Sequence, residues 1–373
     1  METTKYDLLA CDYQELEQVI LNCGEKSFRT SQLFGFFHRQ HKREIHQLSN
    51  FSKGLQEKLK TADQDTGLSI DHVKESTDGT RKYRLRTLEG QFIESVFIPN
   101  ASRPGRNTIC ISSQVGCAMG CTFCATSKMG LKRNLSAAEI VGQIYTVLSD
   151  LKQIGWKNSE IDHDPSESAR IIHNIVYMGM GEPLHNYPNV VKSIKLLCDE
   201  RGQGYSPRRI TVSTCGLVSK IADLLNDTDV HIAISLNATN NKTRAEIMPV
   251  NKKWPIEELL ATCKNLPMAP RRRITFEYVL LGGVNDSLNE ARELVPLVAN
   301  IKCKVNLIPF NAHPLSPFSK PKSEDVKAFQ EFLIQHHVSV FVRGTRGDDI
   351  NVACGMLGAK KLDSAIEAAA KIH

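Results

Sequence analysis

The feature that most constrains the fold is a series of short apolar segments that alternate with amphipathic helical patterns. The segments are rich in Val and Ile, which is typical of buried strands. The expected strands cover residues 109–112, 175–178, 210–213, 231–235, 274–280 and 305–308, with a further candidate at 338–342. Repeated strand–helix units imply a parallel sheet. Six such units predict an α/β fold built as an incomplete (β/α)6 barrel rather than a full eight-stranded barrel.

Start signals for helices support this alternation. Residues 136–139 read S-A-A-E, a capping-box pattern, and apolar residues then recur at helical spacing. Residues 287–290 repeat the pattern as S-L-N-E, and Pro255 opens another helical segment. The polar stretch 152–170 interrupts the alternation, and we expect it to be an inserted loop.

Two smaller parts are expected before the barrel and one after it. Residues 1–75 are interpreted as a helical N-terminal domain, 76–106 as a β-hairpin and linker, 107–345 as the barrel and 346–373 as a C-terminal segment. Between residues 26 and 60, Lys and Arg outnumber Glu by eight to two. This surplus fits an accessory module that contacts RNA phosphates as well as it fits an ordinary solvated helix face.

Composition limits the class of protein and its expected cellular location. The 373 residues are 41% hydrophobic, enough for a real core, and the net charge of +6 permits a nucleic-acid partner without requiring one. The sequence shows no basic start followed by an apolar run, and no stretch long enough to span a membrane. We therefore expect a cytoplasmic monomer. In that reducing setting its 11 cysteines are more often ligands or catalysts than disulfides.

Three of the cysteines follow the first expected strand closely. Cys117, Cys121 and Cys124 have the spacing C-x3-C-x2-C, and three thiolates in one loop can bind a soft metal centre. A 4Fe-4S cluster usually takes four cysteines, so three would leave one iron open for a further ligand. Spacing alone also allows zinc, with Cys110 as a fourth ligand, or a disulfide. Of these, the spacing favours the iron–sulfur cluster.

Polar residues also follow several of the other strands. In a parallel barrel, reactive groups collect where the strands end. Any one of these residues alone is more commonly a turn former or a helix cap, so their expected convergence is the stronger argument. The residues that we expect at this mouth are Gly181, Glu182, Ser213, Ser235, Leu236, Asn237 and Asn311.

A distant segment adds one more candidate. Residues 343–355 are polar and contain several glycines, and Cys354 lies near the end of this stretch. A flexible segment would carry this thiol to the barrel mouth, where the upstream arginines would favour its thiolate. A buried cysteine that simply packs as a small apolar residue is an equally good interpretation.

The cysteine loop resembles a known superfamily. With Phe123 before the last cysteine, C-x3-C-x-F-C is similar to the cluster loop of radical S-adenosylmethionine (SAM) enzymes, in which SAM chelates the open iron. The wider set of segments resembles the RlmN/Cfr family of RNA adenine methyltransferases, in family order from about residue 94 to 355. The matching segments are CISSQVGC, MGMGEPL, ITVST, LIPFN and RGTRGDDINVACG.

The resemblance implies a role for each matching residue. Cys354 would carry the methyl group, Cys110 would be its partner in a transient disulfide, and Glu94 would be the general base. The cluster would be held by Cys117, Cys121 and Cys124, and SAM by Gly181, Glu182, Ser213, Ser235, Leu236, Asn237 and Asn311. Two residues depart from the family pattern: Asn237 stands where His is common, and Cys215 where Ser or Val is usual.

The resemblance also implies an activity. It is methylation of carbon 2 of an adenosine in 23S rRNA, with the adenosine 37 region of tRNA as a second candidate substrate. Two SAM molecules would be used per turnover, and an electron-donor reductase system would restore the thiols. The alternatives are Cfr-type methylation of carbon 8, which Pro183 disfavours, and a non-catalytic RNA-binding protein stabilised by zinc.

Overall fold

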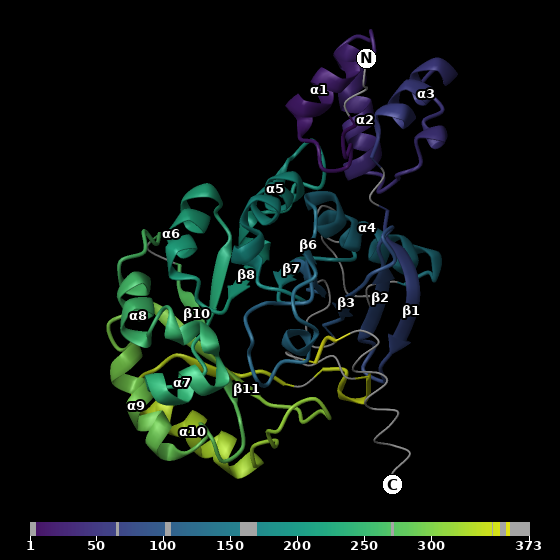
Figure 1. Cartoon of the computed structure of the whole chain (residues 1–373). Coiled ribbons are helices and arrows are strands. Elements are labelled where there is room, and N and C mark those ends of the chain that lie inside the picture. Colours follow the sequence, from purple (N-terminus) through teal and green to yellow (C-terminus); the bar gives the residue numbers. More distant parts are fainter. Residues whose placement is uncertain are drawn as a thin grey trace.

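A curved mixed sheet organises the molecule, with the helices mainly on its outer side (Figure 1). The computed structural model describes residues 5–64, 67–100, 106–156, 170–269, 272–344, 346–350 and 356–358. Within these residues the sheet has ten strands, in the order β1-β2-β3-β4-β7-β8-β9-β10-β11-β12. From β4 onward the strands follow the order of the chain, as successive strand–helix units of one hand would place them.

The part of the sheet from β4 to β12 is parallel throughout. This confirms the predicted α/β partial barrel and includes the candidate last strand. The strands are β4 (Thr108–Cys110), β7 (Asn174–Tyr177), β8 (Ile210–Thr214), β9 (His231–Ser235), β10 (Ile274–Leu280), β11 (Cys303–Pro309) and β12 (Val340–Val342). Their carboxyl ends share one edge of the sheet.

Helices connect these strands. The helices are α4 (Ala137–Gln153), α5 (Tyr187–Cys198), α6 (Val218–Asp227), α7 (Asn241–Ile247), α8 (Ile256–Lys264), α9 (Leu288–Val298) and α10 (Ser323–Gln335). Ser136 and Glu139 form the predicted capping box at the start of α4. Ser287 caps α9 by accepting from the backbone N–H of Asn289, so the expected reciprocal box is replaced by a simpler cap. Of the expected loop at 152–170, residues 157–169 lie outside the described residues.

Three antiparallel strands extend the barrel sheet beyond β4. They are β1 (Ser69–Glu75), β2 (Arg81–Arg86) and β3 (Phe92–Ile98), and β3 pairs with β4. The expected hairpin is therefore a three-stranded unit, and residues 69–75 are not helical as the sequence interpretation had them. β1 is an edge strand with mostly exposed side chains, so its sequence lacks the apolar alternation that marks a half-buried strand.

The N-terminal helices pack directly on the barrel. They are α1 (Tyr13–Asn22), α2 (Phe28–His38) and α3 (Lys53–Ala62). The fully buried His38 bonds through Nδ1 to the hydroxyl of Tyr145 on α4, at 2.9 Å. From the loop after α5, Gln203 donates to the carbonyl of His38, and the Arg201 guanidinium lies 4.1 Å from the ring centroid of Tyr13. A histidine thus lies at the centre of this contact.

In the part of the chain that the structure describes, no helix combines the length and the apolar character that crossing a bilayer would require.

The buried histidine predicts a pH-dependent stability. Burial lowers the pKa of His38 to about 3, from an ordinary value of 6.5. Below pH 6.5 the unfolded chain therefore binds a proton at His38 that the folded chain does not bind. The free energy of unfolding falls as pH drops through this range. Between pH 7 and pH 5, about 2 kcal/mol of the loss should come from this residue. His38→Phe should remove that part of the pH dependence in urea unfolding, whatever its effect at pH 7.

The exposed His72 on β1 provides the control. His72→Gln should leave the pH dependence of unfolding as it is in the wild type. An unchanged pH dependence in His38→Phe would contradict the role assigned to the buried ring.

Candidate functional site

A small hairpin presents the three clustered cysteines. β5 (Gln114–Val115) and β6 (Arg133–Asn134) pair antiparallel, and the loop that contains Cys117, Cys121 and Cys124 lies between them. Gly116 has a φ of +77°, and a Cβ at this position would overlap the carbonyl oxygen of Gly130 across the base of the loop. Only glycine therefore fits where the loop closes.

Three separate parts of the chain hold this loop in place. The Thr122 N–H donates to the carbonyl of Ile247 at the end of α7, at 3.0 Å. His313, after β11, lies with its Nε2 3.0 Å from the carbonyl of the buried Phe123. Thr126 donates to the carbonyl of Leu357 in the C-terminal segment. The loop is thus fixed against both the barrel mouth and the end of the described chain.

The loop and the strand ends line one cavity of about 130 Å³. The structure therefore brings together most of the residues that the sequence placed at the mouth. The candidates on this cavity are Cys117, Cys121, Cys124, Gly181, Glu182, Ser213, Ser235 and Asn237. Leu236 and Asn311 are not among its lining residues: Leu236 is fully buried behind the mouth, and Asn311 follows the end of β11.

Two of the three cysteines lie where a free thiolate is disfavoured. Burial raises the pKa of Cys117 to about 12, and it raises that of Cys121 well above the ordinary value. The neighbouring cysteines and Glu182 act in the same direction. Thiols bind metals as thiolates, so a bound cationic centre would supply the charge that this pocket lacks. Within the described residues, no three His, Cys, Asp or Glu side chains are grouped so that they can hold a single metal ion.

Glu182 is held at the mouth by backbone donors. Its Oε1 accepts from the N–H of Leu184 at 3.0 Å, and its Oε2 accepts from that of Cys215 at 2.8 Å. The carboxylate is buried, and burial raises its pKa. Cys215 lines the same cavity and is also buried, so the unusual thiol lies against this carboxylate. The Glu182 carboxylate therefore gives the mouth a hydrogen-bond acceptor that is shielded from water.

The glycines beside Glu182 are required for packing. A Cβ on Gly179 would come within 2.6 Å of the carbonyl carbon of Ile111, and one on Gly181 within 2.5 Å of the Gln114 side chain. The sequence analysis placed Gly181 at the mouth as a residue that would bind SAM. The structure shows that both glycines line the cavity and also let the turn after β7 pass close to the segment that leads into the cysteine loop.

Asn237 has a structural role that explains why an amide suits this position. It has a φ of +57°, which asparagine tolerates better than most residues. Its Oδ1 accepts from the N–H of Val279 on β10 at 2.8 Å, and its Nδ2 lies 3.1 Å from the sulfur of Met248. Both ends of the side chain are engaged within the protein.

Arg244 is a residue that sequence reasoning missed. It is fully buried and donates to the carbonyls of Cys215, Ser235 and Leu236, each at 3.0 Å. One side chain therefore ties the ends of β8 and β9 together behind the cavity. An arginine within a polar helical pattern carries no signal for such a position, because surface helices commonly contain arginine.

A second group lies on the antiparallel extension. Cys110 lies directly opposite Val96 on β3, and Glu94 is two residues before Val96, so all three share one face of the sheet. Glu94 is fully buried, and its Oε1 lies 3.2 Å from the Nζ of Lys82. The sequence candidates Glu94 and Cys110 are thus neighbours, although neither lines the cysteine cavity.

The C-terminal segment connects the two groups. The N–H of Gly358 donates to Oε2 of Glu94 at 3.1 Å, and the carbonyl of Leu357 accepts from Thr126 in the cysteine loop. Met356 is buried against Ala125 of the same loop. Cys354 itself lies outside the described residues. Three consecutive residues close to it in sequence thus bridge Glu94 and the cysteine loop.

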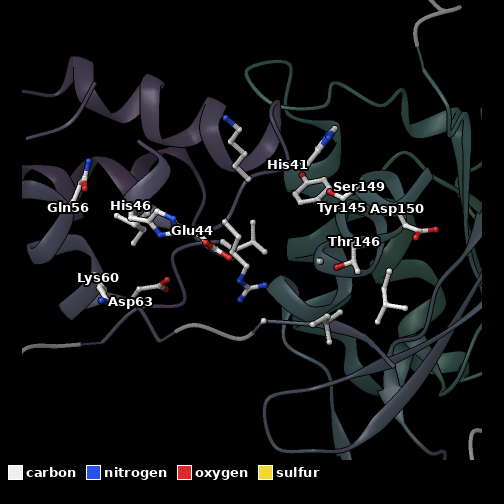
Figure 2. Close-up of a pocket in the computed structure, with 18 of the residues that line it drawn as sticks. His41, Glu44, His46, Gln56, Lys60, Asp63, Tyr145, Thr146, Ser149 and Asp150 are labelled. Atoms are coloured by element: carbon white, nitrogen blue, oxygen red, sulfur yellow. Dashed lines mark ion pairs between the residues drawn. The ribbon is translucent and has the colours of Figure 1, made fainter. Parts of the chain in front are cut away.

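A larger cavity lies elsewhere. A groove of about 930 Å³ separates the N-terminal helices from α4. Figure 2 shows Glu44, His46 and Lys60 on one side of it and Tyr145 and Asp150 on the other. Its charges are mixed, and they come from Lys42, Arg43, Lys60, Glu44, Glu57, Asp63 and Asp150. None of the residues singled out from the sequence as catalytic, SAM-binding or metal-binding lines it, so cavity size does not mark the reacting groups here.

Family models match two parts of the chain. Residues 111–295 match the radical SAM superfamily, and this range spans β5 to α9. Residues 6–63 match the N-terminal domain of ribosomal RNA large subunit methyltransferases, and this range covers the three N-terminal helices.

Relatives match over nearly the whole length. The dual-specificity RNA methyltransferase RlmN of Geotalea uraniireducens is 44% identical over 97% of this chain and 99% of its own. That of Pelobacter propionicus is 43% identical over 97% and 98%. A crystal structure of a radical SAM methyltransferase from Sphaerobacter thermophilus is similar with a TM-score of 0.86 and 39% identity, and it covers 95% of this chain and 99% of that one.

The closure of the cysteine loop predicts an effect of Gly116→Ala. The new Cβ would meet the Gly130 carbonyl in a backbone conformation that alanine rarely adopts, so the variant should lose at least about 2 kcal/mol of unfolding free energy. Gly35→Ala in α2, where a Cβ meets nothing within 4 Å, should instead stabilise by up to about 1 kcal/mol. Urea unfolding measures both. Equal effects of the two substitutions would refute this account of the loop.

The buried guanidinium predicts a second effect. Arg244→Met should cost at least about 3 kcal/mol, because it leaves buried carbonyls at the ends of β8 and β9 without donors. Arg244→Lys keeps the charge but loses the planar guanidinium group. Its loss of unfolding free energy should lie between that of Arg244→Met and that of the wild type. Arg208→Met, at an exposed position, should stay within about 0.5 kcal/mol of the wild type. If Arg244→Met unfolds at the wild-type urea concentration, Arg244 does not hold the strand ends.

Proposed function

The chain belongs to the RlmN family of radical SAM RNA methyltransferases, and on that premise we propose that it methylates carbon 2 of an adenosine in 23S rRNA. The adenosine 37 region of tRNA is the proposed second substrate. The observation that carries the proposal is the bridge formed by residues 356–358 between Glu94 and the cysteine loop. It supports a site in which a general base, Glu94, and the cofactor-binding loop act on the same substrate.

The residues present fit a radical SAM site. Cys117, Cys121 and Cys124 would hold three irons of the 4Fe-4S cluster, and the SAM residues would be Gly181, Glu182, Ser213, Ser235, Leu236, Asn237 and Asn311. Glu182, with its buried carboxylate at the mouth, is the best placed of these to accept from an amino group. Leu236 and Asn311 would act from beside the cavity. When bound, the cluster and SAM would supply the methyl carbon and the radical that removes a hydrogen atom from it, with two SAM molecules used per turnover.

The protein's own thiols would carry the methyl carbon. Cys354 attacks a methyl group of SAM as a thiolate, so its sulfur–carbon bond forms as the bond to the SAM sulfur breaks. After this carbon has joined the adenine ring, the unpaired electron would return to the bound cluster, and Glu94 takes the ring proton. The Cys110 thiolate then attacks the sulfur of Cys354, so a disulfide forms as the sulfur–carbon bond between protein and RNA breaks, and the released carbon takes up a proton to become the methyl group. An electron-donor reductase system returns both cysteines to thiols.

The described residues near Cys354 support this assignment. Met356 follows it by two residues and packs against Ala125 in the cysteine loop. Two residues of extended chain span at most about 7 Å, so the separation in sequence between Met356 and the proposed methyl carrier is short. Cys110 and Glu94 share one face of the sheet, and Glu94 bonds to Gly358. A methyl carrier at position 354 is therefore close in sequence to residues that contact both the cysteine loop and Glu94.

The N-terminal helices are the proposed RNA-binding module. Six of the eight Lys and Arg residues between 26 and 60 are exposed: Lys26, Arg39, Lys42, Lys53, Lys58 and Lys60. The groove in Figure 2 is a poorer candidate for phosphate, because carboxylates share it with the cations. We place the RNA on the exposed basic surface rather than in that groove. The working state that we propose is a cytoplasmic monomer.

Product analysis tests the proposal. Anaerobic reaction of the cluster-loaded protein with 23S rRNA and SAM should yield 2-methyladenosine in mass spectra of the digested RNA. Recovery of 8-methyladenosine would establish the Cfr-type reaction instead. Cys110→Ala should trap protein covalently on RNA, because Cys354 then has no partner thiol to release it. Normal turnover by that variant would remove the disulfide step.

A further inference from the structure

A buried ion pair links the two strands that carry Glu94. The Nζ of Lys82 on β2 lies 3.2 Å from Oε1 of Glu94 on β3, and the side chains are 4% and 1% exposed. Lys82 lies directly opposite Val96, two residues from Glu94, so the pair is diagonal across the hairpin. Lysine is rarely buried to this extent without a partner. The register of the two strands thus places the Lys82 ammonium beside Oε1 of Glu94.

The surroundings of the pair are defined on both faces of the sheet. Ser95 and Tyr83 point toward α4, where they bond to Gln143 and Asp150, so Lys82 and Glu94 point to the opposite face. Arg84, directly opposite Glu94, pairs with Asp71 on β1 through Nε and Oδ2 at 2.5 Å. Arg84 thus has an acidic partner on the edge strand, whereas Lys82 contacts Glu94.

The two oxygens of Glu94 have different neighbours. Oε1 faces the Lys82 ammonium, whereas Oε2 accepts from the N–H of Gly358 in the segment that follows Cys354. A carboxylate without a cation in such a buried place favours its protonated form. A protonated carboxyl group has no capacity to take a proton from a substrate. The nearby ammonium offsets this effect of burial and favours the ionised form.

We propose that Lys82 is a positioning residue for the methylation, which keeps Glu94 ionised so that its carboxylate takes the adenine ring proton. The inference rests on the proposed function, because it assumes that Glu94 is the base. Lys82 does not contact the substrate. The proton from the ring goes to the carboxylate of Glu94, which leaves a neutral carboxyl group beside the lysine side chain.

The test compares Lys82→Met with Lys82→Arg over a range of pH. In Lys82→Met the methylation rate at neutral pH should fall at least about tenfold and recover as pH rises, because Glu94 then ionises only at higher pH. Lys82→Arg keeps the cation and should regain much of the rate at neutral pH. Arg86→Met, at an exposed position on the same strand and face, should have the wild-type profile. Iron content and labelling of the protein by methyl-labelled SAM without RNA should be normal in all three.

Other outcomes overturn the inference. A rate in Lys82→Met that is reduced equally at every pH, or unchanged, means that Lys82 does not act through the ionisation of Glu94. Loss of protein labelling or iron in both variants means that the residue is merely structural. If the wild type labels itself but forms no methyladenosine, the proposed function fails, and the inference fails with it. Glu94→Gln provides the reference, and adding Lys82→Met to it should cause no further loss of rate.

Discussion

Parallel pairing of β4, β7, β8 and β9 is the constraint on which the site depends. It brings the carboxyl ends of these strands to one edge of the sheet, where the cysteine loop closes over them. Arg244 fixes this edge from behind through backbone carbonyls, and Gly116 lets the loop turn back on itself. The mouth is therefore built by backbone geometry, and the side chains that line it are held before any ligand binds.

The antiparallel extension adds the second half of the site. β3 pairs with β4, so the face that carries Glu94 also carries Cys110 at the start of the barrel sheet. The C-terminal segment crosses from this face to the cysteine loop, with one hydrogen bond at each end. The proposed reaction needs a substrate that meets both groups at once. The segment after Cys354 is the part of the described chain that touches both of them.

Sequence patterns predicted the repeating parts of this fold well. The alternation of Val- and Ile-rich segments with helical patterns placed the parallel strands because each is apolar in its own right. β1 was missed because an exposed edge strand needs no apolar pattern. Arg244 and Lys82 were missed for a different reason. Each has its role through partners that only the folded sheet brings near, such as the diagonal contact between Lys82 and Glu94. Gly181 was expected at the mouth, but its close contact with Gln114 was not foreseen, because a sequence does not show which backbone will pass nearby.

The central claim is that a thiol in the C-terminal segment carries the methyl carbon from cofactor to RNA. The most direct measurement is mass spectrometry of the peptide that contains Cys354, before and after RNA is added to the cluster-loaded protein and methyl-labelled SAM. The account predicts one labelled methyl group on Cys354 before RNA is added, and the same label on adenosine afterward. RNA that becomes methylated while Cys354 never carries the label would contradict it.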